Sequence, residues 1–521
     1  MRRVPVLWVV FLLVLVIGGG AAWASQKELT YQIAERNGYK EIEVRTALAS
    51  YIFSEDGGTL KSLFLHFAPW GSAVGELVPG TRTDHKSWER QYVADTRFPF
   101  ELDTDPEGPF AWTYVLSEPQ EVSADELVVA FRGEIGDLRV VKQFTIRNDP
   151  YYTVDVAVEL DNASGNPIDL WMTLGDYLPQ AKGPSLLLQF DGESGESVLA
   201  PGSYAAFDGL GLMDKATVFF LKTDSGSEAF PFKERTPAGN WHFGVKFVSG
   251  QGPSKIAFSL YGGRRRYLLM EPAGLGALDD PGAGARMMIP VIQFLELLYR
   301  HTGNYGWAII LFTLLTRVVL FPLMRKQFHS MAKMQRLQPS LKKIQERFKD
   351  DRQLMQQKLM ELYKKEGINP LGGCFPLLLQ FPILILLWKA ILYSGEQVHL
   401  SPGFLWLPDL SLQDPYYILV IVTTLLMIVQ QWLMTPASAG ERGGSQKLFG
   451  YVMPIMLAVF LYRFPAGLWL YYFLTTIFQV GQQAFVNWEL ARAEEAVAPS
   501  LMEDADASEE DDGDRDDQAG D

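Results

Sequence analysis

Cysteine is almost absent from this sequence of 521 residues, which contains only Cys374. A single cysteine cannot form an intrachain disulfide, so any part of the chain in an oxidising compartment must be stabilised by packing alone. Residues 40–270 also lack histidine and carboxylate groupings, metal-ligand spacings and a glycine-rich phosphate loop. We therefore expect no catalytic residues and no enzyme activity, and neither a metal nor a cofactor.

Positive charge is scarce at the C-terminal end of the chain. The formal net charge is −15, and residues 501–521 hold eleven Asp and Glu against one Arg, which leaves −10 in this tail and −5 elsewhere. The tail shows no apolar periodicity and its charges repel one another, so we expect it to be disordered. Direct binding of RNA by an acidic tail is disfavoured, because nucleic-acid phosphates attract basic segments.

Charge of either sign is rare in six long apolar segments. About 20 apolar residues are needed for a helix to cross a bilayer. None of the six segments contains Asp or Glu. The predicted spans are residues 4–23, 305–324, 374–393, 416–434, 448–462 and 466–486.

The distribution of Lys and Arg predicts the orientation of these spans. Residues 325–366 contain twelve Lys and Arg against five Asp and Glu, whereas residues 394–415 contain no Lys or Arg. Basic flanks stay in the cytoplasm, so the first region is expected inside and the second outside. This places both termini in the cytoplasm and residues 25–285 in the periplasm. Because Ala22, Trp23 and Ala24 form a possible cleavage site, residues 1–24 are either an anchor or a cleaved signal peptide.

Residues 40–270 have the period-two pattern of β-strands. Val154, Val156, Val158 and Leu160 alternate with polar or small residues, which gives one buried and one exposed face. Many short strands without intervening helices predict an antiparallel β-sandwich. Tryptophans at strand spacing favour the core over a sugar-stacking role, because they bury large apolar areas. The other predicted strands are 60–67, 127–132, 138–147, 218–221, 241–248 and 256–261, and the tryptophans are Trp70, Trp88, Trp112 and Trp171.

Two amphipathic regions flank the second span. Residues 286–303 carry apolar side chains at helical spacing and predict a helix along the outer membrane surface. After the span, Met331, Met334, Leu337 and Leu341 begin an apolar stripe, and a second stripe follows Asp351. Residues 325–369 therefore predict a cytoplasmic helical hairpin, with Pro339 kinking or restarting its first helix. Its basic face either meets lipid headgroups, RNA or a protein, or is simply solvated.

Arg317 is the most informative residue, since it lies inside the second predicted span. Counting from Met324 at about 1.5 Å per residue places it about 10 Å below the cytoplasmic interface. No carboxylate in the spans can neutralise it, so water or polar side chains must do so. The candidates at this depth are Thr313, Thr316, Gln380, Gln430, Gln479 and Gln482.

Several helices thus contribute polar groups at one level of the membrane. We infer a hydrated cavity that is open to the cytoplasm and closed to the outside. A polar or acidic segment of a nascent protein can enter such a cavity at lower cost than it can enter lipid. A purely structural Arg317 that caps carbonyls, a small-solute transporter, and an envelope enzyme acting on glycans are the competing interpretations.

Several sequence motifs resemble the YidC/Oxa/Alb family of membrane insertases. The segment from Asn369 to Pro376, continuing to Gln380 and Pro382, resembles the entry to the third span of bacterial members with a large periplasmic domain. Residues 330–339, 406–417 and 464–472 match further motifs in the same order. The resemblance covers residues 287–490.

The resemblance implies an insertase and folding chaperone that works alone or beside the Sec translocon. Its implied partners are nascent membrane proteins, ribosomes, the signal recognition particle pathway and membrane lipids. DNA is not among the implied partners. It implies a substrate groove centred on Arg317, with Tyr471 and Tyr472 contacting the client, a hairpin needed for activity, and a sugar-binding-like supersandwich without catalysis.

The expected fold is a polytopic α-helical membrane protein with six spans and a five-helix insertase core, joined to a periplasmic antiparallel β-sandwich. The expected parts are the anchor 1–24, the sandwich 25–285, the interfacial helix 286–303, span 304–324, the hairpin 325–369, span 374–393, the periplasmic loop 394–415, span 416–434, the cytoplasmic loop 435–447, spans 448–462 and 466–487, and the tail 488–521.

Overall fold

The computed structural model describes most of the chain between residues 27 and 492. The described residues are 27–68, 75–78, 98–104, 112–175, 186–191, 195–198, 208–223, 229–235, 241–279, 282, 286–367, 375–434, 444–486, 488, 489 and 492. The predicted first span with its possible cleavage site, nearly all of the acidic tail, Cys374, Trp70 and Trp88 lie outside them. The chain divides into two compact units, which comprise residues 1–292 with 390–411, and residues 293–389 with 412–521.

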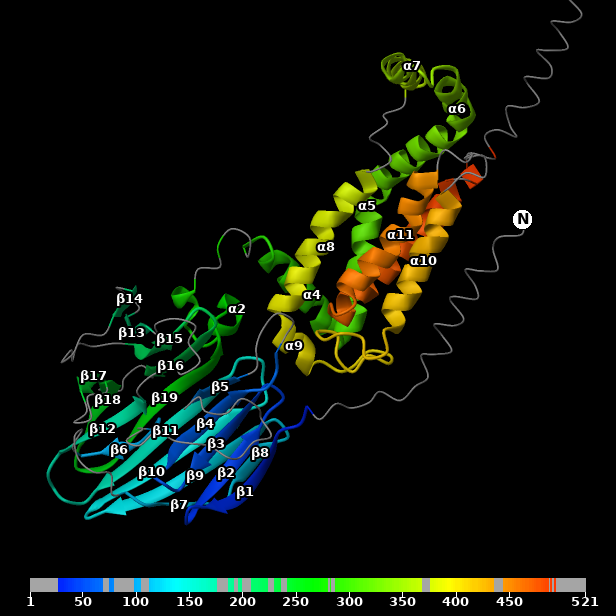
Figure 1. Ribbon diagram of the computed structural model, residues 1–521. Helices are drawn as coiled ribbons and strands as arrows, with labels where there is room; N and C mark the ends of the chain where they lie inside the picture. The colour runs from blue at the N-terminus through cyan, green and yellow to red at the C-terminus, as the bar shows by residue number, and fades with distance from the viewer. Residues whose placement is uncertain are drawn as a thin grey trace, which may run out of the picture. The chain divides into compact units, whose positions relative to one another are not determined.

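The first unit is built from three antiparallel sheets (Figure 1). The five-stranded sheet has the order β1 (Thr30–Arg36), β2 (Tyr39–Arg45), β3 (Ala49–Ser54), β4 (Thr59–Leu65) and β5 (Gly75–Val78). The four-stranded sheet has the order β17 (Ala229–Arg235), β18 (Trp241–Ser249), β12 (Ile168–Gly175) and β6 (Leu102–Asp103).

The ten-stranded sheet forms the largest layer of this unit. Its order is β14 (Gly195–Val198), β13 (Leu186–Asp191), β15 (Gly209–Met213), β16 (Thr217–Thr223), β19 (Gly252–Arg264), β11 (Thr153–Asn162), β10 (Leu138–Arg147), β9 (Glu126–Ile135) and β7 (Tyr114–Leu116), with β8 (Gln120–Ser123) also paired to β9. The short helices α2 (Tyr267–Met270) and η1 (Gly276–Leu278) follow β19.

Alternation along the strands produces the core of the β-sandwich. In β11, Val154, Val156 and Val158 are buried, while Asp155 and Ala157 between them are half-buried on the other face. Phe53 of the five-stranded sheet contacts Phe144 of the ten-stranded sheet with ring centroids 4.5 Å apart. Phe247 of the four-stranded sheet contacts Phe258 of the ten-stranded sheet, with 6.3 Å between the ring centroids. The two smaller sheets therefore pack against one face of the large sheet, and the antiparallel prediction is confirmed.

The predicted strands coincide with observed ones, and the aromatic prediction is confirmed at one site. Segments 127–132, 138–147, 218–221, 241–248 and 256–261 all lie within strands β9, β10, β16, β18 and β19, and 60–67 largely lies within β4. Trp112 is buried and stacks on Tyr114, with 6.4 Å between the ring centroids. Trp171 is half-buried beneath the ammonium of Lys246, at 4.6 Å.

A buried ion cluster holds residues 390–411 against the sandwich within the first unit. Glu396 is 0% exposed and lies in α9 (Gly395–Leu400). Its carboxylate is 3.0 Å from Arg266 Nη1 and 3.7 Å from Arg264 Nε, and it accepts a hydrogen bond of 3.5 Å from the Tyr152 hydroxyl. Arg266 also donates to the Leu392 carbonyl at 2.9 Å. We call Glu396, Arg264, Arg266 and Tyr152 the Glu396 cluster.

Replacing Glu396 by Gln should strongly destabilise the first unit. The substitution removes the buried carboxylate that faces two arginines, and breaking a buried ion pair typically costs about 3–5 kcal/mol. Thermal or urea unfolding of the purified protein measures the effect. Glu159→Gln is the matched control, because Glu159 pairs with Lys255 at 3.0 Å on the exposed surface, where a pair contributes about 0–1 kcal/mol. Equal losses in both variants would contradict the argument.

Lys142 is a second buried charge within the sandwich. Its ammonium is 0% exposed and donates to the carbonyls of Gly57 at 2.7 Å and Phe100 at 2.6 Å. Burial lowers the pKa of Lys142 to about 7, against the opposing influence of Glu101. Lys142 thus ties β10 to the turn before β4 and to the segment before β6.

The low pKa of Lys142 predicts a sandwich that becomes more stable as the pH rises above 7. A lysine in the unfolded chain keeps its proton up to a pKa of about 10.4. Between these values the unfolded state binds a proton that the folded state lacks, so the free energy of unfolding rises by up to about 1.4 kcal/mol per pH unit. Below pH 7 both states are protonated and this contribution is constant.

Urea unfolding at pH 7, 8 and 9 checks this prediction by comparing the wild type with Lys142→Met. The variant should lose the additional rise in stability, while Lys255→Met on the exposed surface should retain it. Parallel pH curves for the wild type and Lys142→Met would show that Lys142 does not titrate in this range.

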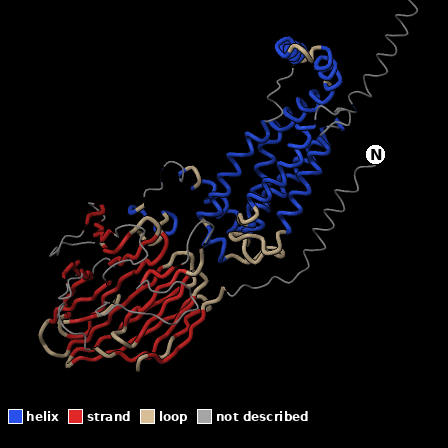
Figure 2. The backbone as a smooth tube through the Cα atoms, viewed as in Figure 1, coloured by secondary structure: helices blue, strands red, loops and turns tan. Residues whose placement is uncertain are grey.

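The second unit is predominantly helical (Figure 2). Helix α4 (Ile289–Thr302) precedes α5 (Tyr305–Arg336), α6 (Gln338–Arg347) and α7 (Arg352–Lys365), and then α8 (Phe375–Tyr393), α10 (Ile418–Met434) and α11 (Gly444–Leu461) follow. A further helix occupies residues 466–486. Within the described residues, one segment, Tyr305–Arg325, is long and apolar enough to cross a membrane. Shorter apolar segments are Gln380–Tyr393, Ile418–Gln431 and Tyr451–Leu461.

Helix α5 extends beyond the predicted span. The predicted span ends at residue 324, next to the end of the apolar segment at Arg325, and α5 continues from there to Arg336. The physical reason is that the residues after Met324 are mostly good helix formers and include neither Gly nor Pro. The helix restarts as predicted at Pro339, which occupies the first turn of α6. Asp351 caps α7 by accepting from the backbone N–H groups of Gln353 and Leu354.

Candidate functional site

Arg317 lies in the middle of α5, facing other helices of the second unit. Its neighbours Val318 and Val319 are 70% and 74% exposed, whereas Arg317 itself is only 4% exposed. The guanidinium Nη2 donates to Gln380 Oε1 of α8 at 2.7 Å. This turn of α5 thus has an exposed apolar face and a buried polar face.

Tyr471 completes a hydrogen-bonded chain across three helices. The Gln380 side-chain amide donates to the Tyr471 hydroxyl at 2.8 Å, so one glutamine joins α5 and α8 to the 466–486 helix. Phe312, one turn before Arg317, lies 6.4 Å from the Tyr471 ring. We call Arg317, Gln380 and Tyr471 the Arg317 cluster. Its partners are neutral, as expected for spans that contain no carboxylate.

The other predicted polar residues do not all join this cluster. Thr313 donates to the Ile309 carbonyl at 2.7 Å and Thr316 to the Thr313 carbonyl at 2.8 Å, so both hydroxyls satisfy their own helix. Gln430 donates to Gln479 at 3.2 Å and joins α10 to the 466–486 helix. These four side chains therefore have hydrogen-bond partners other than Arg317, and their place in a substrate groove stays a prediction.

The expectation of a hydrated cavity around Arg317 stays a prediction, and the structure adds a direct partner for the guanidinium. At 4% exposure the guanidinium is covered in this conformation, and Gln380 occupies the position expected for water. Sequence alone shows that amides are available at this depth, but not that one of them bonds the guanidinium directly. In this conformation Arg317 is thus a buried cation with a neutral amide as its direct partner.

Several buried oxygens in the second unit lack a hydrogen-bond partner among the described residues, and three of them lie on two neighbouring helices. These three are Thr423 Oγ1 of α10, and Thr475 Oγ1 and Gln482 Oε1 of the 466–486 helix. Buried hydroxyls and amides in native proteins are nearly always satisfied by protein or water. Sequence reasoning singled out Gln482 but missed Thr423 and Thr475. The paired threonines at 423–424 and 475–476, within otherwise apolar segments, were the available signal.

The remaining predicted site residues are placed as follows. Tyr472 is half-buried and lies 6.4 Å from Trp469 in an edge-to-face arrangement. Leu337 and Leu341 are half-buried at the start of α6. The backbone of Met331 and Met334 belongs to α5, and their side chains lie outside the described atoms. Within the described ranges, no group of three or more His, Cys, Asp or Glu side chains is arranged to hold a metal ion.

Comparison with known proteins shows what the helical part of the chain is similar to. The profile described as "60Kd inner membrane protein" matches residues 297–493. A protein of Wolinella succinogenes named "Membrane protein insertase YidC" is 42% identical over 294 residues, which is 55% of this chain and 52% of that protein. One of the same name from Geobacter metallireducens is 29% identical over 87% of both chains. Over residues 297–493 the chain is thus similar to the 60Kd inner membrane proteins, and these relatives carry the name YidC.

The extent of these matches differs between relatives. The alignment spans about half the length of the Wolinella protein (52%) but most of the Geobacter protein (87%). These relatives are named membrane protein insertases, and the matching family is described as an inner membrane protein.

Solved structures of the family are also similar to this chain. A crystal structure titled "Active YidC insertase crystal structure with the first transmembrane domain resolved" is 21% identical, with a TM-score of 0.49 over 92% of this chain and 98% of that one. YidC from Thermotoga maritima is 18% identical, with a TM-score of 0.45 over 87% of this chain and 98% of that one.

Proposed function

We propose that this protein inserts nascent proteins into the bacterial inner membrane and assists their folding. The observation that carries the proposal is Arg317, a buried cation in an apolar helix whose hydrogen-bond partner among the described residues is the neutral Gln380. A charge is costly at this depth and is usually retained for function. The names of the family relatives in Wolinella and Geobacter support the same activity.

The Arg317 cluster acts as a resting polar centre that a client replaces. An acidic or polar segment of the client displaces Gln380 and pairs with the guanidinium, so its lost hydration is compensated within the inner half of the membrane. Thr423, Thr475 and Gln482 offer unsatisfied oxygens to water or to the client on neighbouring helices. The hydrophobic part of the client then passes along exposed apolar helix faces into lipid.

We further propose a topology of six spans with both termini in the cytoplasm and the β-sandwich in the periplasm. The support is the charge distribution, with twelve Lys and Arg in residues 325–366 and none in residues 394–415. The α6 and α7 pair then forms a cytoplasmic hairpin that meets ribosomes or the signal recognition particle. Cooperation with the Sec translocon and contact with lipids complete the proposed set of partners.

Reconstitution tests the proposed activity. Purified protein in liposomes is expected to insert a short single-span substrate with an acidic N-terminal tail, measured by protease protection, well above protein-free liposomes. Release of a trapped small dye or ion from the same liposomes is the control for a channel. Dye release without substrate insertion would contradict an insertase and favour a transporter.

A further inference from the structure

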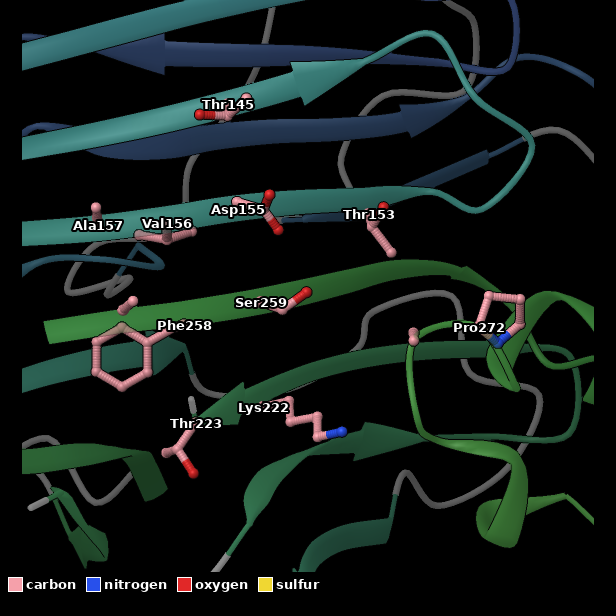
Figure 3. A pocket seen from close by; sticks show the side chains of 12 residues that line it. Thr145, Thr153, Asp155, Val156, Ala157, Lys222, Thr223, Phe258, Ser259 and Pro272 are labelled. Atoms are coloured by element: carbon pink, nitrogen blue, oxygen red, sulfur yellow. The ribbon is translucent and has the colours of Figure 1, made fainter. Parts of the chain in front are cut away.

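A pocket of about 530 Å³ lies on the outer face of the ten-stranded sheet, within the first unit (Figure 3). Strands β10, β11, β19 and β16 form its floor, and Pro272 and Ala273 border it. Its floor includes the side chains that alternate with the core-facing residues of these strands, so it lies opposite the sandwich core. Its volume falls in the range of small-molecule sites, about 300–1,000 Å³.

A row of polar side chains crosses the pocket because the strand register aligns them. Thr145 is directly opposite Asp155, Asp155 is opposite Ser259, and Ser259 is opposite Lys222. Neighbouring strands are about 4.8 Å apart, so the row extends for roughly 14 Å over four strands. Ala157 and Ala257 lie beside this row, and their small side chains leave room above the sheet.

Lys222 supplies a cation whose position is restricted by the backbone. Gly274 has φ +73°, and a Cβ added there would overlap with Lys222 Nζ. The Lys222 ammonium has neither a hydrogen-bond acceptor nor a carboxylate partner in the described part of the chain. The Gly274 turn thus holds a half-buried positive charge at one end of the pocket.

Asp155 does not neutralise this cation, since it has its own partner. Its Oδ2 accepts a hydrogen bond of 2.6 Å from Arg147 Nη1. Asp155 is thus paired with Arg147, which also lies 3.6 Å from Glu126, whereas Lys222 is the cation among the residues that line the pocket. The free Asp155 oxygen, with the hydroxyls of Thr145 and Ser259, remains available to accept or donate hydrogen bonds to a ligand.

We propose that this pocket, the Lys222 pocket, binds an acidic, hydroxyl-rich small molecule. The acidic group pairs with Lys222, and the hydroxyls of the ligand bond Ser259, Asp155 and Thr145 along the row. The apolar CH faces of the ligand rest on Ala157 and Ala257. Two sources share this chemistry, namely a saccharide that contains a uronic acid and a glycerol phosphate.

Binding to the full-length protein in nanodiscs tests the proposal, with isothermal titration calorimetry as the readout. The probes are a disaccharide with one uronic acid, the matched neutral disaccharide, glycerol 3-phosphate and inorganic phosphate. We expect the acidic disaccharide or glycerol phosphate to bind at least about tenfold more tightly than the neutral disaccharide and inorganic phosphate, since loss of one charge-assisted bond costs about 1.5–3 kcal/mol. The tighter binder of these two probes, the acidic disaccharide or glycerol 3-phosphate, shows whether the natural ligand is a uronic-acid saccharide or a glycerol phosphate.

Variants connect the binding to the pocket. Lys222→Met and Gly274→Ala should each weaken binding at least about tenfold, the first by removing the cation and the second by displacing it. Lys255→Met, an exposed lysine on β19 that pairs with Glu159, should bind as the wild type does, and unchanged melting temperatures show that the variants are folded.

Three results would overturn the proposal. They are no saturable binding of any acidic probe, inorganic phosphate binding as tightly as the hydroxyl-rich probes, and unchanged binding by Lys222→Met. Insertion activity is not the readout, so the proposal stands or falls separately from the insertase function.

Discussion

Arg317→Ala is expected to reduce insertion of a substrate with an acidic N-terminal tail by about tenfold or more. Placing an Asp at the centre of a membrane helix costs about 2.5–3.5 kcal/mol, and each 1.4 kcal/mol corresponds to a factor of ten. If Arg317 offsets half of this cost, its loss produces the expected effect. Liposomes with matched amounts of wild-type and variant protein provide the measurement by protease protection.

The charge of the substrate tail separates this mechanism from a merely structural role for Arg317. A substrate whose tail acids are replaced by Gln or Asn should lose less than about threefold with Arg317→Ala, because no carboxylate then needs a partner. Arg317→Lys should restore part of the insertion of the acidic substrate. Equal losses for the acidic and neutral tails would indicate that Arg317 only stabilises the helices.

Gln380→Leu is expected to destabilise the second unit by about 3 kcal/mol. The substitution removes the acceptor of the Arg317 guanidinium and the donor to the Tyr471 hydroxyl in one step. A buried cation without a partner typically costs about 3–5 kcal/mol. Thermal unfolding in detergent, followed by intrinsic fluorescence, measures the loss.

Two further variants make the Gln380 prediction specific. Gln479→Leu breaks the bond from Gln430, which joins two neutral side chains, so it should cost only about 1 kcal/mol. Adding Arg317→Met to Gln380→Leu removes the unpaired charge and should recover most of the stability, without recovering insertion of the acidic substrate. If the double variant is no more stable than Gln380→Leu, the unpaired guanidinium is not the cause of the loss.

The strands of the first unit were predictable because their signal is local. Buried and less buried residues alternate along β10 and β11 because one face of each strand is buried. This pattern can be recognised within each segment alone, and each alternating segment forms a strand. The pairing of strands was not predictable, since it depends on register between segments distant in sequence. The row Thr145, Asp155, Ser259 and Lys222 exists only through that register.

Long-range polar contacts explain what sequence reasoning missed. Arg317 was predicted as the centre of the site because an arginine in an apolar segment is conspicuous by itself. Its direct bond to Gln380, 63 positions away, required the packing of α5 against α8. The burial of Glu396 was not predictable, because an acid in a loop without Lys or Arg is expected to be solvated. In the structure it is fully buried against Arg264 and Arg266.

Photo-crosslinking to a ribosome-stalled nascent membrane protein tests the central claim most directly. A crosslinking amino acid at Thr316, which is half-buried beside Arg317, should form adducts with the client at the stage when its acidic tail enters the membrane. The same probe at Val459, 69% exposed on α11, serves as the control and should react mainly with lipid. Strong client adducts at Thr316 that disappear with a neutral tail are predicted, whereas adducts at Val459 alone would contradict a client route through the Arg317 cluster.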